Sequence, residues 1–114
     1  SVTFKGIEGM DKMKSIMEGY RKNPPKKAGE YQIQKIRDYK NDTITDLETG
    51  KVTPTGLPKS DVLYFELGKD AWCAIRPSGT EPKIKFYFGV KGESMEDAGQ
   101  RLDTLMKDEI FQVN

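Results

Sequence analysis

Histidine is absent from the sequence, and cysteine occurs once, at Cys73. Catalysis by a Ser-His-Asp or Cys-His group is therefore excluded for this chain, as is any metal site that uses histidine. A single cysteine cannot form an internal disulfide. Because Cys73 falls within an apolar strand pattern, we interpret it as a small buried hydrophobic residue, with a reactive thiol as the alternative.

The sequence also lacks a strong net charge and any long apolar run. The 19 Lys and Arg residues against 18 Asp and Glu residues give a net charge of +1, which provides no broad field for nucleic acid or a membrane surface. No apolar run approaches the ~20 residues of a membrane-spanning helix, and no signal-like segment opens the chain. We therefore expect a cytoplasmic protein without nucleic-acid or membrane partners, in which any anion site is local.

The length and composition indicate one small domain. The 114 residues suit a single domain, which we assign to residues 1–114. Apolar residues make up 35% of the chain and charged residues 32%. This modest apolar content favours a sheet that is covered on one face, or a piece of a larger protein.

Hydrophobic periodicity predicts a helix near each end of the chain. In residues 6–25, apolar side chains recur every three or four positions before two prolines end the pattern: Ile7, Met10, Met13, Ile16, Met17 and Tyr20. We interpret this Met-rich stripe as facing the core, with a groove for a partner helix as the alternative. Ser94 is a suitable N-cap for the final helix, with Asp97 as the reciprocal acceptor of a capping box. The predicted inner stripe of that helix is Ala98, Leu102, Leu105 and Met106.

Alternating apolar and polar residues predict strands between the helices. Residues 30–39 form one strand candidate whose phase slips after Ile33, which a bulge would explain. Residues 61–76 are typical of a hairpin, and residues 83–90 carry an unbroken apolar row. Residues 40–61 are polar and predict a long connection that packs on a neighbour, with a short strand near Thr43. With the first strand and a further short strand near Thr3 and Phe4 counted only loosely, the order predicts an α+β fold. The expected architecture is a four-stranded antiparallel sheet with two helices on one face.

The loop "RPSGTEP" combines groups that suit a phosphate. Arg76 offers a planar fork for two phosphate oxygens, and the hydroxyls of Ser78 and Thr80 are further donors. Gly79 permits a positive φ and close approach of backbone N–H groups. Lys83 and Lys85 share one face of the next strand, and either adds a positive charge at the mouth of the loop. The alternative is a plain β-hairpin turn whose Ser, Gly and Thr serve only the backbone.

Two features of the loop limit what it does. The carboxylate of Glu81 would repel a phosphate, so the site requires it to point away or to pair with Lys83. Ser78 is a poor candidate nucleophile, because no histidine exists to activate it. No phosphate loop of the form G-x-x-x-x-G-K-[ST] occurs either.

The stretch "RPSGTEPKIKFYF" resembles the phosphate-binding loop of the α-D-phosphohexomutases, the family of phosphoglucomutases and phosphomannomutases. The shared pattern is R-x-S-G-T-x-P followed by apolar, basic, apolar and Tyr positions. The opening helix and the helix after Ser94 are also similar to those of the C-terminal domain in that family. The resemblance therefore extends over essentially the whole chain, as the fourth and last domain of a four-domain enzyme.

The resemblance implies a fold and a role for each loop residue. The family's last domain has a fold likened to TATA-binding protein, with a four-stranded antiparallel sheet and two helices. Arg76, Ser78 and Thr80 match the side chains that hold the substrate's phosphate, and Gly79 matches a position where backbone amides help. Lys85 falls where many members have an arginine. Lysine keeps the charge and loses the fork, so its role is less defined.

The family interconverts hexose 1-phosphates and 6-phosphates through a 1,6-bisphosphate. The resemblance implies that this domain binds a phosphorylated hexose, holds the phosphate that is not reacting and closes over the cleft with the other domains of the parent chain. Phosphoglucomutase is favoured, with phosphomannomutase and phosphoglucosamine mutase as the other members considered.

The departures from the family are also informative. Its phosphoserine loop, its magnesium loop of the form D-G-D-x-D-R and its sugar-reading loop do not occur here. We therefore expect a fragment that is inert alone, with no catalytic residue, metal ligand or cofactor of its own, and expect Mg and a phosphoserine in other domains of the parent. Two other classes stay open: a stand-alone module for phosphorylated ligands or nucleic acid, and an interaction domain.

Overall fold

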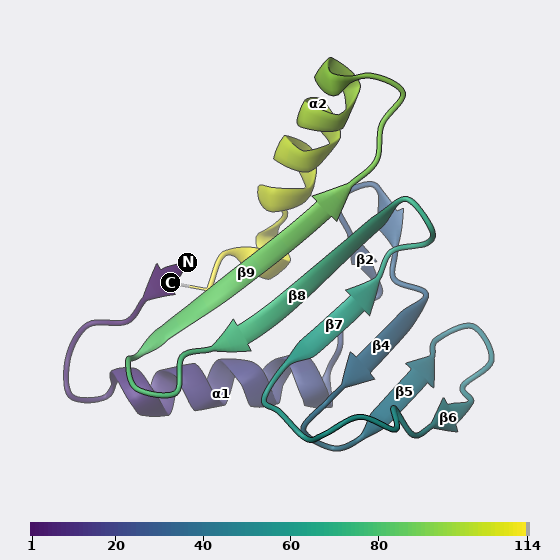
Figure 1. Cartoon of the computed structure of the whole chain (residues 1–114). Helices are drawn as coiled ribbons and strands as arrows, with labels where there is room; N and C mark the ends of the chain where they lie inside the picture. The colour runs from purple at the N-terminus through teal and green to yellow at the C-terminus, as the bar shows by residue number, and fades with distance from the viewer. Residues whose placement is uncertain (114) are drawn as a thin grey trace.

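The computed structural model describes residues 1–113 and has an α+β fold. Seven strands form one antiparallel sheet, and two short strands form a separate one. Both helices lie on the same side of the large sheet (Figure 1). The predicted fold class and the placement of the helices are thus confirmed, whereas the predicted number of four strands is wrong.

The extra strands lie at the edges of the predicted sheet. In chain order the elements are β1 (Val2–Thr3), α1 (Gly9–Lys22), β2 (Lys27–Ala28), β3 (Tyr31–Gln32), β4 (Lys35–Asp38), β5 (Thr43–Asp46), β6 (Val52–Thr53), β7 (Leu63–Glu66), β8 (Ala71–Pro77), β9 (Lys83–Val90), α2 (Met95–Met106) and the 3-10 helix η1 (Glu109–Phe111). The sheet order is β1-β9-β8-β7-β4-β5-β6. Strands β9, β8, β7 and β4 are the four that the sequence predicted for the sheet. Strands β1 and β5 lie where short strands were expected near Thr3 and Thr43, and β6 was not predicted.

The strand predicted over residues 30–39 is two strands that belong to different sheets. Strand β3 pairs with β2, whereas β4 pairs with both β5 and β7. Ile33 and Ile36 are both buried although an odd number of positions separates them. The phase slip therefore marks the passage of the chain from one sheet to the other, and the predicted bulge is wrong.

Residues 40–61 contain two strands, where the sequence predicted a long connection with one short strand. Strand β5 confirms the short strand predicted near Thr43, and β6 pairs with it in turn. The turn from β4 to β5 uses Asp42 in the left-handed region, at φ 57°. The Asp42 carboxylate accepts hydrogen bonds from the N–H of Thr55 at 3.1 Å and from its hydroxyl at 2.6 Å. These bonds fasten the far end of the segment to the turn.

Both helices pack on one face of the sheet and share a single core. From α1 the core receives Met13, Met17 and Tyr20, each at most 8% exposed, and from α2 it receives Leu105 at 0%. The ring of Tyr20 lies edge-on to that of Phe65, with 6.3 Å between ring centroids. The Met-rich stripe is therefore a core feature, as predicted.

Two residues assigned to the helix stripes are exposed. Ile7 is fully exposed, because Gly6 at φ 94° turns the chain and α1 begins only at Gly9. Met106 is the last residue of α2 and is 47% exposed. Phe111 from η1 fills the core at this end, with its ring edge-on to the rings of Phe86 and Phe88.

The start of α2 differs from a capping box by one residue. The hydroxyl of Ser94 accepts the N–H of Asp97 at 3.0 Å, as predicted for an N-cap. The Asp97 carboxylate accepts the N–H of Glu93 at 2.9 Å, where a capping box would use the N–H of Ser94 itself.

Cys73 lies in β8 and is 0% exposed. Burial raises the pKa of its thiol, so the thiolate does not form near neutral pH. The interpretation of Cys73 as a buried hydrophobic residue is confirmed.

Candidate functional site

The predicted phosphate loop joins β8 to β9 at one end of the sheet (Figure 1). Arg76 and Lys85 are direct partners across these two strands. Their neighbours Ile75 and Ile84 are buried in the core beneath the helices. Alternation along each strand therefore directs Arg76 and Lys85 to the opposite face of the sheet, called the open face below because no helix covers it within the described residues. Side chains directly opposite in this way have Cβ atoms about 5 Å apart. The fold therefore brings together the two cations that the sequence proposed for one anion.

Arg76 differs from the other arginines of the chain in its surroundings. Of the four arginines, three make ion pairs: Arg21 with Asp38, Arg37 with Glu66 and Arg101 with Asp97. Within residues 1–113, Arg76 has no acidic partner and faces a lysine instead. Like charges directly opposite destabilise a sheet. An anion bound between the two side chains would remove that repulsion.

The backbone of the loop is held by Ser78. Its N–H donates to the carbonyl of Lys83 at 2.8 Å, and its hydroxyl oxygen accepts the N–H of Glu81 at 3.2 Å and that of Thr80 at 3.4 Å. Ser78 thus has the backbone role expected of a plain turn. Its own O–H hydrogen remains available to a ligand, because a hydroxyl both donates and accepts.

Gly79 and Thr80 form the exposed tip of the loop. Gly79 is not in the left-handed region, so the loop does not use glycine for a positive φ. A Cβ placed on Gly79 would meet no atom within 4 Å. The tip is therefore open to close approach by a ligand. Glu81 is also exposed, and the predicted ion pair with Lys83 is not formed within the described residues.

The contacts that hold the phosphate loop from the N-terminal segment were not predicted from the sequence. Strand β1 pairs with the start of β9, and the N–H of Phe4 donates to the carbonyl of Pro82 at 2.7 Å. Gly9, the first residue of α1, packs against the same Pro82. The short strand predicted near Thr3 and Phe4 corresponds to β1, but its pairing with β9 was not predicted. Gly6 and Gly9 were assigned to the helix pattern.

Farther along the open face, aromatic rings cover the sheet. The rings of Tyr64 and Trp72 stack with 5.6 Å between centroids, and the guanidinium of Arg37 lies 5.9 Å from the Tyr64 ring. A Cβ on Gly89 would lie 2.0 Å from the indole nitrogen of Trp72, so any larger residue here would displace the ring. The stack shields the strands and leaves the end with Arg76 uncovered.

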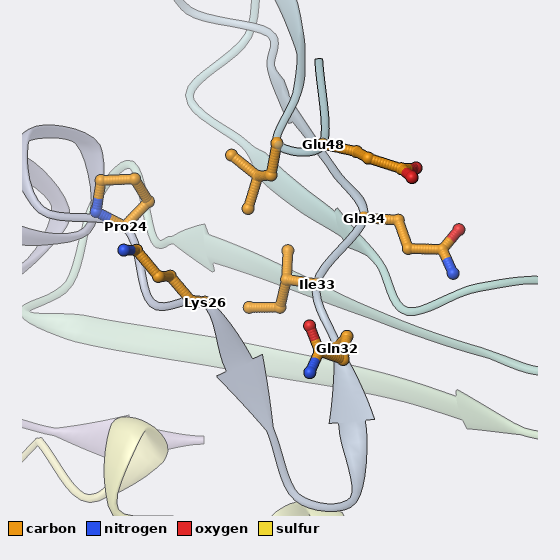
Figure 2. A pocket seen from close by; sticks show the side chains of 7 residues that line it. Pro24, Lys26, Gln32, Ile33, Gln34 and Glu48 are labelled. Atoms are coloured by element: carbon orange, nitrogen blue, oxygen red, sulfur yellow. The ribbon is translucent and has the colours of Figure 1, made fainter. Parts of the chain in front are cut away.

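A hollow of about 620 Å³ lies elsewhere on the molecule. Its lining consists of Pro24, Lys26, Gln32, Ile33, Gln34, Leu47 and Glu48. In Figure 2, Ile33 lies between Pro24 and Lys26 on one side and Gln34 and Glu48 on the other. Gln34 immediately precedes β4 and Leu47 follows β5, so the antiparallel register puts the hollow at the end of the sheet opposite the loop. Its rim carries both a cation and an anion and does not favour a phosphate.

Residues 1–113 contain no cluster of three or more carboxylate and thiol side chains that could bind a metal ion. They therefore do not fit the magnesium site of the family. No helix in this part of the chain is long and apolar enough to cross a membrane.

Comparison with known proteins identifies the family. Residues 27–105 match the family model described as "Phosphoglucomutase/phosphomannomutase, C-terminal domain". Proteins named phosphoglucomutase from Staphylococcus aureus strains MSSA476 and MRSA252 are 35% identical over 106 residues, and that of strain N315 is 34% identical. These alignments cover 93% of this chain and 19% of each relative. No solved structure matches. The chain belongs to the phosphoglucomutase/phosphomannomutase family and corresponds to its C-terminal domain.

Proposed function

We propose that this chain is the substrate-phosphate-binding domain of a phosphohexomutase. The parent enzyme interconverts hexose 1-phosphate and hexose 6-phosphate through a 1,6-bisphosphate. The observation that carries the proposal is the pair of facing cations, Arg76 and Lys85, which have no acidic partner within residues 1–113. A phosphate dianion would complement this pair, and the adjoining loop offers hydroxyl and amide donors.

Each loop residue has a distinct role in this proposal. Arg76 donates two parallel N–H bonds to phosphate oxygens, and Lys85 supplies a second positive charge. The hydroxyls of Ser78 and Thr80 donate to the remaining oxygens. Gly79 admits the phosphate close to the backbone, since no atom would obstruct even a Cβ at that position.

The held phosphate is the one that does not react. Its binding energy orients the sugar so that the other phosphate lies at the reacting centre. The sugar turns around between two phosphoryl transfers, so the loop holds each phosphate in its turn. Closure of this domain over the cleft would exclude water and protect the phosphoryl group from hydrolysis.

The chemical step itself belongs to other parts of the parent enzyme. Phosphoryl transfer needs a metal ion and a nucleophile, and the described residues do not fit a magnesium site. We therefore propose that residues 1–114 are the last domain of a four-domain enzyme and are inert alone. Glucose phosphates are the favoured substrates, because the similar Staphylococcus aureus proteins are named phosphoglucomutase.

Titration with inorganic phosphate, followed by the backbone amide NMR shifts of the 114-residue chain, tests the site. We expect shifts in residues 76–85 at phosphate concentrations on the order of tens of millimolar, since a single subsite binds weakly. Arg76→Ala should weaken binding about tenfold or more, because it removes charge-assisted hydrogen bonds.

Lys69→Ala is the matched control. It removes a positive charge from an exposed turn between β7 and β8, at the opposite end of the sheet. If this variant weakened phosphate binding as much as Arg76→Ala, the effect would be one of net charge and the proposed site would be wrong. Absence of any shift in the wild-type chain would also count against it.

A further inference from the structure

The segment before α1 is joined to the phosphate loop by main-chain hydrogen bonds. Val2 and Thr3 of β1 are paired with Ile84 and Lys83, the first residues of β9. Immediately beyond this pairing, the N–H of Phe4 donates to the carbonyl of Pro82 at 2.7 Å. The side of the loop that leads into Lys85 therefore rests on the N-terminal segment.

Gly9 fits between two parts of this junction. A Cβ on Gly9 would lie 2.8 Å from the carbonyl oxygen of Phe4 and 2.8 Å from the Cβ of Pro82. Both distances are too short for real contacts, so any larger residue must displace one of these groups. Gly19 in the same helix has no atom within 4 Å of such a Cβ. The two glycines of α1 thus differ in what surrounds them.

We propose that residues 2–9 act as a brace that sets the position of the phosphate loop, with Gly9 as the positioning residue. This inference rests on the proposed function of the loop and adds a group that does not touch the phosphate. The brace fixes Pro82, and Pro82 precedes the strand that presents Lys85 opposite Arg76. A shift of Pro82 therefore changes the spacing between the two cations.

The same contacts couple phosphate binding to the docking of β1. If the loop binds phosphate well only when β1 is paired, then phosphate must in turn favour the paired state of β1. The connection is short and consists of backbone and a proline ring. A change of position at Phe4 is passed to the loop without a flexible side chain between them.

Gly9→Ala and Gly19→Ala test the positioning role as a matched pair. Both replace glycine by alanine in α1, and both gain helix propensity. We expect Gly9→Ala to weaken phosphate binding about fivefold or more relative to Gly19→Ala, measured by amide NMR titration while both variants are folded. Gly19→Ala should bind like the wild-type chain.

The wild-type chain gives a second test that does not depend on a variant folding. Amide hydrogen exchange is measured with and without phosphate, and the N–H of Phe4 is compared with that of Gly50, which donates to Asp46 at 2.7 Å. At a phosphate concentration ten times its Kd, exchange at Phe4 should slow by up to about tenfold, while exchange at Gly50 stays constant.

The outcomes separate the two proposals. If the wild-type chain gives no shifts with phosphate, the proposed function fails. If Arg76→Ala abolishes binding but Gly9→Ala binds like Gly19→Ala, the brace is wrong and the site stands. Unchanged exchange at Phe4 when the loop is saturated would equally overturn the brace.

Discussion

Arg21 and Arg76 are the same residue type in opposite surroundings. The side chain of Arg21 is 12% exposed, and its Nε lies 3.2 Å from both carboxylate oxygens of Asp38. Its Nη2 lies 2.7 Å from Asp61. Arg76 is exposed and faces Lys85 across the sheet. The fold therefore compensates the charge of Arg21, whereas no acidic side chain within residues 1–113 compensates that of Arg76.

The pairing of Arg21 with Asp38 and Asp61 stabilises the fold. Asp38 is 8% exposed and also accepts N–H bonds from Lys40 and Asn41. Arg21 thus ties the end of α1 to β4 through Asp38 and to the segment before β7 through Asp61. The placement of Arg76 opposite Lys85 lowers the stability of the fold, because the two cations repel each other. A ligand is the simplest reason for a fold to retain such a repulsion.

The largest expected effect comes from removing the compensated arginine. Arg21→Ala leaves the buried carboxylate of Asp38 without its cation, and we expect a loss of about 3 kcal/mol in the free energy of unfolding. Urea denaturation measures this loss. Phosphate-induced shifts in residues 76–85 should remain, since Arg21 lies outside the loop.

Arg101→Ala is the control for Arg21→Ala, because it removes an arginine whose partners are exposed. We expect it to lower the free energy of unfolding by much less. Equal losses in the two variants would contradict the distinction between buried and exposed pairs. Loss of phosphate binding in a folded Arg21→Ala chain would show that the two regions are coupled.

A smaller effect is expected from giving Arg76 a partner. Lys85→Glu replaces a like-charged cross-strand pair by an opposite-charged one, and we expect a gain of about 0.5 kcal/mol in the free energy of unfolding. Phosphate binding should be lost, because the introduced carboxylate neutralises Arg76 and repels the dianion. Lys85→Gln removes the repulsion without adding a pair, so its stability should fall between those of the other two chains. A destabilised Lys85→Glu chain would contradict the repulsion argument.

Local patterns predicted the parts of this fold that depend on neighbouring residues in the sequence. The alternation from Lys83 to Val90, the hairpin before it and the Ser94 cap involve contacts within a few positions, and all are observed. The four predicted central strands followed from the same alternation. The residues of the candidate site were predicted from the phosphate-binding groups gathered in one short loop, with Lys85 chosen by its strand face and by the resemblance.

Contacts between distant segments explain what the sequence did not predict. The two-residue strand β6 is too short to show a period and exists because β5 offers an open edge. The short strand near Thr3 was predicted, but its pairing with β9 was not. Phe111 enters the core only because the chain turns back after α2. Within residues 1–113, the lack of an acidic partner for Arg76 and the fit of Gly9 against Pro82 are likewise properties of the folded chain.

Arg101 lies between Arg21 and Arg76, since it is paired but only partly buried. Its partner Asp97 gives the smallest expected effect on stability. The N–H of Glu93 and then the guanidinium of Arg101 hold the pKa of Asp97 below its usual value. A lowered pKa in the folded state contributes stability above the ordinary aspartate pKa of about 4, and this contribution is lost as the pH falls through the folded-state value. Asp97→Asn should therefore lower the urea midpoint slightly at pH 7, and the difference from wild type should close below about pH 4.

Asp103→Asn is the control for Asp97→Asn. It removes the same charge from the same helix, at a carboxylate that pairs with Lys107 and has no backbone N–H partner within the described residues. A difference that stays constant across this range would mean that Asp97 acts through its shape as a cap, and that its charge does not stabilise the helix.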